Sequence, residues 1–106
     1  MITFEEFKKL DIRIGKIVFA EKVAGADKLL RLEIDFGMEK RQVVAGIAEA
    51  YQPEQILGKE IPVLMNLEPR KIRGVESQGM ILAVGIEGKS VLMHPDQEVP
   101  PGSIVR

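Results

Sequence analysis

Apolar and polar residues alternate along most of the chain, which indicates a protein built mainly from β-strands. The clearest run covers residues 30–36, where every second residue is apolar and the residues between them are charged. Strict alternation is the pattern of a strand with one buried face. Four further strands are predicted at 11–22, 41–45, 61–65 and 79–86, and a shorter one at 90–93. Short turns at 24–27 and 37–38 join the first three strands into an antiparallel meander.

The first strand carries an irregularity near its centre. Ile12 and Ile14 share one parity, whereas the apolar residues from Ile17 onward share the other. A one-residue bulge at Gly15 and the following lysine would absorb this change and bend the strand. We therefore predict a long strand over 11–22 that bends at a glycine bulge, as a small closed barrel requires.

The N-terminal residues predict a short helix. Thr3 and Glu6 have the spacing of a capping box, in which each side chain satisfies the backbone N–H of the other residue. Phe4 and Phe7 then lie on one face. These features predict a helix of two turns over 3–10.

A second helical segment is expected between the third and fourth strands. Within residues 46–57, Pro53 suits a first helical position, and Gly58 suits the residue after a helix end. Two stretches lack a regular pattern, namely the polar stretch 66–78 and the proline-rich tail 95–104. We expect the first of these to be an irregular loop.

Five main strands, a bent first strand and a helix between strands three and four are typical of an OB fold. The predicted fold class is therefore all-β, a five-stranded Greek-key OB barrel with a short N-terminal helix. An SH3-like barrel is the competing architecture, but it has no helix at that place. The length of 106 residues predicts a single domain over 1–106.

Composition excludes several classes of function. Fifteen Lys and Arg residues are balanced by 16 Asp and Glu residues, so any nucleic-acid binding must come from a local patch. Cysteine is absent and histidine occurs once, which excludes disulfide scaffolds and thiolate or multi-histidine metal sites. No apolar run approaches the ~20 residues of a membrane span, and the N-terminus lacks the apolar segment of a signal peptide. We expect a cytoplasmic protein without a cofactor.

No arrangement of residues predicts catalysis. Gly74 and Gly79 have the spacing of a P-loop, but Met80 and Ile81 stand where the loop needs Lys and Ser or Thr. His94 lies at a strand end beside Pro95 and Asp96, but no nucleophile and oriented partner accompany it, so we interpret it as a surface residue in a turn. The carboxylates are scattered and mostly alternate with apolar strand residues, which is typical of the solvent-exposed faces of strands.

The stretch between the fourth and fifth strands is the strongest candidate site. Arg70, Lys71 and Arg73 lie within four residues, in a loop that flanks the ligand face of an OB fold. Cationic side chains contact phosphates, while amides and hydroxyls reach sugars and base edges. Three short polar residues lie in the same stretch, namely Asn66, Ser77 and Gln78. A solvated turn with scattered cations is the alternative reading.

Several motifs together resemble the tRNA-binding domain at the C-terminus of many methionyl-tRNA synthetases. They are DIRIGKI at 11–17, ADKL at 26–29, VAGI at 44–47, NLEPRKIRGVESQGM at 66–80 and PDQEVPPG at 95–102. The same motifs are similar to the free-standing structure-specific tRNA-binding proteins and to the endothelial-monocyte-activating polypeptide group. The chain departs from the family at 23–25, where His-Pro is common. It also lacks the extra C-terminal piece of the eukaryotic members, and the chaperone-like members are a weaker match.

The resemblance implies a non-catalytic module that binds folded tRNA with little sequence preference. It also implies a link to methionyl-tRNA synthetase, as its free-standing or C-terminal part. Few aromatic residues are available for base stacking, which favours recognition of shape and phosphates. The expected tRNA-binding residues are Lys28, Asn66, Arg70, Lys71, Arg73, Ser77, Gln78 and Met80, with Lys16 and Arg31 as possible additional contacts.

The chain is also expected to form a homodimer. Apolar residues outside the barrel strands must cover either the barrel end or a second chain, and the family's short forms pair with themselves. The expected interface residues are Phe4, Phe7, Val99, Pro100 and Ile104. Two alternative functions stay open at this point. One is a protein–protein docking module, and the other is a chaperone-like peptide binder with an exposed apolar groove.

Overall fold

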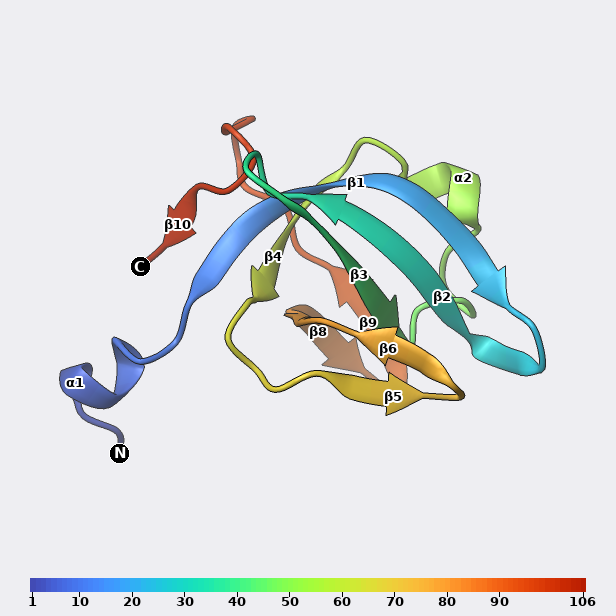
Figure 1. The fold of residues 1–106 in the computed structure, drawn as a ribbon, viewed down its shortest axis with the longest axis horizontal. Helices are drawn as coiled ribbons and strands as arrows, with labels where there is room; N and C mark the ends of the chain where they lie inside the picture. Colours follow the sequence, from blue (N-terminus) through green and yellow to red (C-terminus); the bar gives the residue numbers. More distant parts are fainter.

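The computed structural model describes residues 1–106 and is organised around one strongly curved antiparallel sheet (Figure 1). Its strands follow the order β3-β2-β1-β4-β7. The bounds are Ile12–Val23 for β1, Ala26–Asp35 for β2, Lys40–Ala45 for β3, Glu60–Leu64 for β4 and Met80–Ile81 for β7. A short strand, β10 (Ile104–Val105), pairs with the beginning of β1. This five-strand path, with β1 between β2 and β4, is the architecture of the predicted all-β OB fold.

Two small hairpins complete the barrel. The first consists of β5 (Arg70–Ile72) and β6 (Val75–Ser77), and the second of β8 (Ala83–Ile86) and β9 (Lys89–Leu92). The first hairpin lies within the stretch that the sequence predicts as an irregular loop, so that prediction is wrong. Its strands have three residues each and carry few apolar side chains, so no alternation marks them.

The strand predicted over 79–86 is divided at Leu82. Its first part, β7, pairs with β4, and the Leu82 N–H donates to the Pro62 carbonyl at 3.0 Å. Its second part, β8, pairs with β9, which confirms the short sixth strand. As a result, Val84 and Ile86 are exposed to solvent instead of facing the core.

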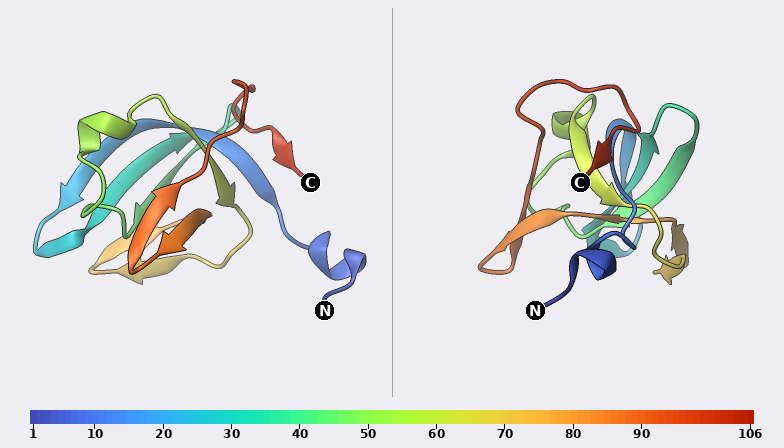
Figure 2. Two further views of the ribbon diagram at one scale, coloured as in Figure 1. Left: turned by 180° about the vertical axis from the view of Figure 1, so that it is seen from behind. Right: turned by 90° about the vertical axis from the view of Figure 1, so that its left-hand side faces the viewer.

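The N-terminal helix, α1 (Phe4–Phe7), has the predicted capping box. The Thr3 Oγ1 accepts from the Glu6 N–H at 3.1 Å, and the Glu6 Oε1 accepts from the Thr3 N–H at 3.1 Å. The helix has one turn instead of two, and it stands apart from the barrel beside the C-terminus (Figures 1 and 2).

The second helix, α2 (Pro53–Ile56), lies between β3 and β4 as predicted, with Pro53 in its first turn and Gly58 just past its end at φ +83°. Residues 47–51 form a hydrogen-bonded turn, in which the Tyr51 N–H donates to the Ile47 carbonyl at 3.0 Å. Neither helix is long and apolar enough to cross a membrane.

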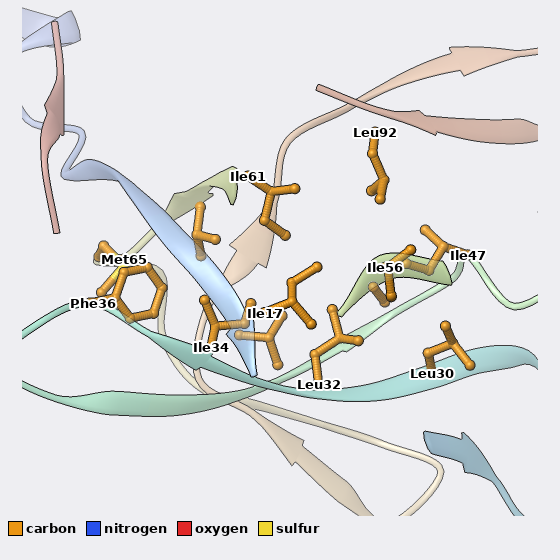
Figure 3. Close-up of a cluster of buried hydrophobic side chains, with 13 residues drawn as sticks. Ile17, Leu30, Leu32, Ile34, Phe36, Ile47, Ile56, Ile61, Met65 and Leu92 are labelled. Atoms are coloured by element: carbon orange, nitrogen blue, oxygen red, sulfur yellow. The ribbon is translucent and has the colours of Figure 1, made fainter. Parts of the chain in front are cut away.

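The core lies inside the curved sheet and contains the apolar residues of β2 and β4 that the alternation predicts (Figure 3). Ile47 and Ile56 close one end of it from the connection between β3 and β4, and Leu92 adds a contact from β9. The core residues are Ile17, Leu30, Leu32, Ile34, Phe36, Val43, Ala45, Ile47, Ile56, Ile61, Val63, Met65 and Leu92.

The change of parity in β1 has a different cause from the predicted bulge at Gly15. β1 pairs regularly with β4 from Ile12 to Lys16, and the register shift against β2 lies between Ile17 and Phe19. Gly15 faces the core, so Ile14 points to the opposite face of the strand. There the C-terminal segment covers it, and the Ile14 N–H donates to the Ser103 carbonyl at 2.8 Å. Both faces of β1 are therefore buried at this point.

Replacing Gly15 with valine should destabilise the protein. A Cβ at Gly15 would overlap the side chains of Ile34 and Phe36 in the core. Overpacking of this kind costs about 1–3 kcal/mol. The measurement is the free energy of unfolding from urea titration, with Gly85→Val as the matched strand control, because a Cβ at Gly85 meets no atom within 4 Å. Equal stabilities of the two variants would contradict this account of Gly15.

Candidate nucleic-acid interface

Backbone and side-chain hydrogen bonds join β3 to the end of β6 and to the segment that connects β6 and β7. The Gln78 N–H donates to the Gln42 carbonyl at 2.8 Å, and the Gln42 N–H donates to the Gln78 Oε1 at 3.1 Å. The Val44 N–H donates to the Ser77 Oγ at 3.0 Å, and that hydroxyl donates to the Gly79 carbonyl at 2.9 Å. We call this contact the seam. It closes the sheet into a barrel at the one side where β3 has no strand partner.

Ser77 and Gln78 therefore have structural roles. Ser77 is 2% exposed, and its hydroxyl both donates and accepts within the protein. This placement corrects the prediction that Ser77 contacts a ligand, because a buried and fully bonded hydroxyl is not available to one. Gln78 is half-buried and uses its side-chain oxygen on β3.

Asn66 is engaged in the same way at another junction. Its Oδ1 accepts from the Asp11 N–H at 2.9 Å, and its Nδ2 donates to the Lys9 carbonyl at 2.6 Å. The side chain ties the segment that follows β4 to the segment before β1. Asn66 is exposed, but these two bonds give it a fixed place in the framework.

The register of the β5–β6 hairpin separates its cations. Arg70 pairs with Ser77 and Lys71 pairs with Glu76. Paired residues share a face and neighbours along a strand alternate, so Arg70 lies on the barrel side with the buried Ser77. Lys71 lies on the outer side beside Glu76.

Arg73 is at the tip of this hairpin. It has φ +54° and Gly74 has φ +80°, which is the backbone of a type I′ turn. This turn allows a two-residue connection between short strands, and it places the Arg73 side chain at the end of the hairpin.

The hairpin borders a groove with two adjoining hollows. One hollow, of about 450 Å³, lies between the hairpin tip and the β1–β2 turn, which are neighbours in Figures 1 and 2. It is lined by Lys28 and Arg73. The other, of about 290 Å³, is lined by Arg70 and Ser90 together with several apolar residues. Leu29 and Ile72 border both hollows, so we treat them as one feature, the hairpin groove.

Three cations at the hairpin groove have no ion-pair partner, namely Lys28, Arg70 and Arg73. Three other arginines of the chain, at positions 13, 31 and 41, form salt bridges elsewhere. Asp27 also lines the first hollow, but it lies in no salt bridge with these cations. The groove therefore presents free positive charge on a protein with a formal net charge of −1. Phosphate groups are ligands that such a site favours.

The structure places the two additional candidates outside the hairpin groove. Arg31 forms ion pairs with Glu21 at 2.7 Å and Glu33 at 3.3 Å. The hydrogen bond that the Arg31 Nε donates to Glu21 is the main reason that the pKa of Arg31 is raised. Lys16 lies in a separate hollow of about 470 Å³, beside Glu60 and His94. Met80, by contrast, is one of the residues that line the second hollow of the groove.

The apolar walls of the groove are the part that the sequence analysis missed. Leu29, Ile72 and Ala83 line it, together with the hydroxyl-bearing Ser90. The sequence did contain one local signal for the hairpin that carries Ile72. Arg73-Gly74, between Ile72 and Val75, has the form of a two-residue hairpin turn.

The residues expected at a dimer interface gather at the opposite end of the molecule. Phe4, Phe7, Ile104 and Val105 line an apolar hollow of about 360 Å³, and Phe4 and Ile104 are 71% and 58% exposed. Val99 lines a neighbouring hollow that also includes Ile104. Pro100 lies on the exposed tail. We call this surface the terminal patch; Figures 1 and 2 show both chain ends here, away from the hairpin groove.

Comparison with known sequences identifies a family over most of the chain. A family model described as "Putative tRNA binding domain" matches residues 12–104. The methionine–tRNA ligase of Methanothrix thermoacetophila is 55% identical over 106 residues, which cover 100% of this chain and 16% of that protein. The chain thus spans about 16% of the length of such curated relatives.

Two solved structures match the whole fold. A MetRS related protein from Pyrococcus horikoshii has a TM-score of 0.94 at 40% identity, covering 100% of this chain and 98% of that one. The chaperone CsaA from Bacillus anthracis has a TM-score of 0.91 at 36% identity, covering 100% and 99%. The overall fold of the chain therefore recurs in both of these proteins.

Removing the Ser77 hydroxyl should weaken the seam. In Ser77→Ala the buried N–H of Val44 loses its acceptor, and an unsatisfied buried donor costs about 1–3 kcal/mol. Ser103→Ala is the matched control, because it removes an exposed hydroxyl that donates to the Pro100 carbonyl. Urea unfolding should give a clearly lower free energy for Ser77→Ala than for the control. A reversed order would contradict the structural role.

Proposed function

The chain belongs to the tRNA-binding domain family, and we propose that it binds folded tRNA through the hairpin groove without catalysing a reaction itself. The observation that carries the proposal is the convergence of Lys28, Arg70 and Arg73 on one groove without a carboxylate partner. These residues come from β2 and from the β5–β6 hairpin. The folded barrel therefore fixes the spacing at which they meet phosphates.

Recognition in this proposal depends on backbone shape more than on base sequence. Each cation that meets a phosphate releases a counterion, which makes binding strongly salt-dependent. The aromatic residues give little help with stacking. Phe36 is in the core, Phe19 lies under Arg31, and the Tyr51 hydroxyl accepts from the Leu92 N–H at 3.1 Å. A rigid set of cations instead selects RNAs whose phosphates match its spacing.

We propose that the module serves a methionyl-tRNA synthetase, either as part of the same polypeptide or as a separate partner. The support is the set of methionine–tRNA ligase relatives, of which the chain matches a small part. A tethered tRNA-binding module raises the effective concentration of tRNA near a catalytic site. This role places the chain in the cytoplasm with the translation machinery.

We also propose that the terminal patch pairs two copies of the chain. Contiguous exposed apolar surface marks an interaction site, and closed two-fold pairs are the commonest oligomers. The chain ends that carry the patch lie apart from the tip of the β5–β6 hairpin (Figure 2), so pairing through the patch would leave both grooves open. Two grooves on one assembly would raise avidity for a large RNA without new kinds of contact.

A chaperone-like function is the second candidate, because one structural neighbour is titled a chaperone and several apolar residues line the groove. Peptide binding by an apolar groove depends little on salt. Phosphate binding by three cations gives a log–log salt slope of about −2 to −3. The salt dependence of binding therefore separates the two functions.

Arg70 and Lys71 are adjacent in the chain but should differ in tRNA binding. Arg70→Gln should lower the affinity roughly three- to tenfold near 0.1 M salt and reduce the salt slope by about 1, since one phosphate contact is lost. Lys71→Gln is the matched control and should have a smaller effect, because Lys71 faces away from the groove beside Glu76. The measurement is a tRNA gel shift at several salt concentrations. A larger loss in Lys71→Gln would contradict the proposed groove.

Light scattering at micromolar concentration should give a mass twice that of one chain. Phe4→Asp should shift the protein toward the monomer, because it puts a charge into the apolar contact. The control is Leu57→Asp, which places a charge on a residue that is also exposed but lies beside α2, away from the terminal patch. A wild-type mass equal to one chain, or an unchanged dimer in Phe4→Asp, would refute pairing through this patch.

A further inference from the structure

A line of side-chain hydrogen bonds crosses the outer face of the sheet and ends on the β5–β6 hairpin. The Arg31 Nη1 donates to the Gln42 Oε1 at 3.0 Å, and the Gln42 Nε2 donates to the Glu76 carbonyl at 2.8 Å. Leu32 is in the core, so its neighbour Arg31 lies on the opposite face of β2. We call this line of bonds, from β2 over β3 to β6, the relay.

The relay holds the hairpin nearer its tip than the seam does. The seam bonds reach the end of β6 and the segment after it, whereas the relay bond reaches Glu76 in the middle of β6. No hydrogen bond joins the barrel to the hairpin closer to Arg73. The position of Arg73 relative to Lys28, which lies across the groove, therefore depends on the side chain of Gln42.

The two partners of the Gln42 amide fix its orientation. A guanidinium only donates hydrogen bonds and a backbone carbonyl only accepts them, so the amide oxygen faces Arg31 and the nitrogen faces Glu76. Turning the amide over would place donor against donor and acceptor against acceptor. Arg31 is itself held from β1, because it pairs with Glu21 at 2.7 Å and lies 5.0 Å from the centre of the Phe19 ring. Three strands of the barrel thus support the hairpin through the relay.

A fixed spacing of cations distinguishes one arrangement of phosphates from another. A mobile hairpin follows the phosphates of any RNA strand, whereas a held hairpin fits only phosphates at matching positions and loses little entropy when it binds them. We propose that Gln42 and Arg31 are positioning residues that make the hairpin groove selective for folded RNA over single-stranded RNA. This inference rests on the proposed function. Both residues act through the position of Arg73.

The ion pairs of Arg31 argue against a direct contact with RNA. Its guanidinium pairs with Glu21 and Glu33, at 2.7 and 3.3 Å, and its side chain is only 21% exposed. A phosphate would have to compete with two carboxylates for the same donors. Arg31 therefore contributes to RNA binding through the relay.

Replacing Gln42 with methionine should reduce the selectivity for folded RNA. The change removes the relay but keeps the side chain uncharged and similar in length. The folded variant should bind tRNA about five- to tenfold more weakly, as for the loss of one hydrogen bond. It should bind an oligouridine of the same length as the wild type does, because all the cations of the groove remain. For the same reason its salt slope with tRNA should not change.

Gln55→Met is the matched control. It removes the side-chain oxygen that accepts from the Gln52 N–H at the start of α2, outside the hairpin groove. Its affinities for tRNA and for oligouridine should equal those of the wild type. A merely structural hydrogen bond lowers stability without changing the ratio of these two affinities. A wild-type ratio in folded Gln42→Met would therefore overturn the inference.

A second variant breaks the relay from its other end. Arg31→Lys keeps the positive charge but loses the planar fork that serves Glu21, Glu33 and Gln42 together. It should lower the ratio of tRNA to oligouridine affinity in the same direction as Gln42→Met, with an unchanged salt slope. A wild-type ratio in folded Arg31→Lys would also overturn the inference.

A measurement on the unaltered protein checks the relay without a variant. In two-dimensional NMR the side-chain amide protons of Gln42 should exchange with water more slowly than those of Gln55, whose Nε2 makes no hydrogen bond within the protein. Equal exchange rates would overturn the inference, and so would equal wild-type affinities for tRNA and oligouridine. Absence of tRNA binding by the wild type would instead refute the proposed function.

Discussion

The hydrogen bonds of Ser77 and Gln78 to β3 hold the barrel closed where no backbone ladder does so. β3 has a strand partner only on its β2 side, and its free edge would otherwise expose the N–H groups of Gln42 and Val44. The side-chain oxygens of Gln78 and Ser77 accept hydrogen bonds from these two N–H groups. The Arg41 guanidinium also donates to the carbonyls of Met65 and Gln78, at 2.7 and 3.2 Å. The β5–β6 hairpin is attached through this seam. The position of the hairpin, and with it the groove, depends on these few hydrogen bonds, most of which involve side chains.

This dependence changes the meaning of the polar residues between positions 66 and 80. Asn66, Ser77 and Gln78 look like ligand contacts in the sequence, because they lie beside three cations. In the structure they fasten the ends of the hairpin segment to the barrel, and the cations remain free. The contiguous motif at 66–80 therefore contains residues with two separate roles. Its polar residues fix the positions of Arg70 and Arg73, and these two arginines carry the positive charge.

The sequence predicts the main sheet because alternation reports burial directly, as in the run from Leu30 to Phe36. It fails at Gly15 because parity alone does not tell which face of a strand is covered. The C-terminal segment covers Ile14 from outside the barrel, so β1 has two buried faces here. In the sequence this pattern resembles a strand with one buried face and a one-residue shift of register. The β5–β6 hairpin was missed since strands of three residues are too short to show a period. The cations of the site could be identified in the sequence. The apolar residues that line the groove come from distant segments, so only the folded structure shows that they lie together.

The distribution of ion pairs explains how a slightly acidic chain can offer a site for a polyanion. Arg31 on β2 pairs with Glu21 on β1 and Glu33 on β2, and Arg41 on β3 pairs with Glu39 just before that strand, so their charge is neutralised locally. Lys28 on β2, Arg70 at the start of β5 and Arg73 at the hairpin tip form no salt bridge. Local potential follows from these placements and not from net charge. Because the free cations belong to elements that only the closed barrel brings together, an intact seam is a condition for the potential at the groove.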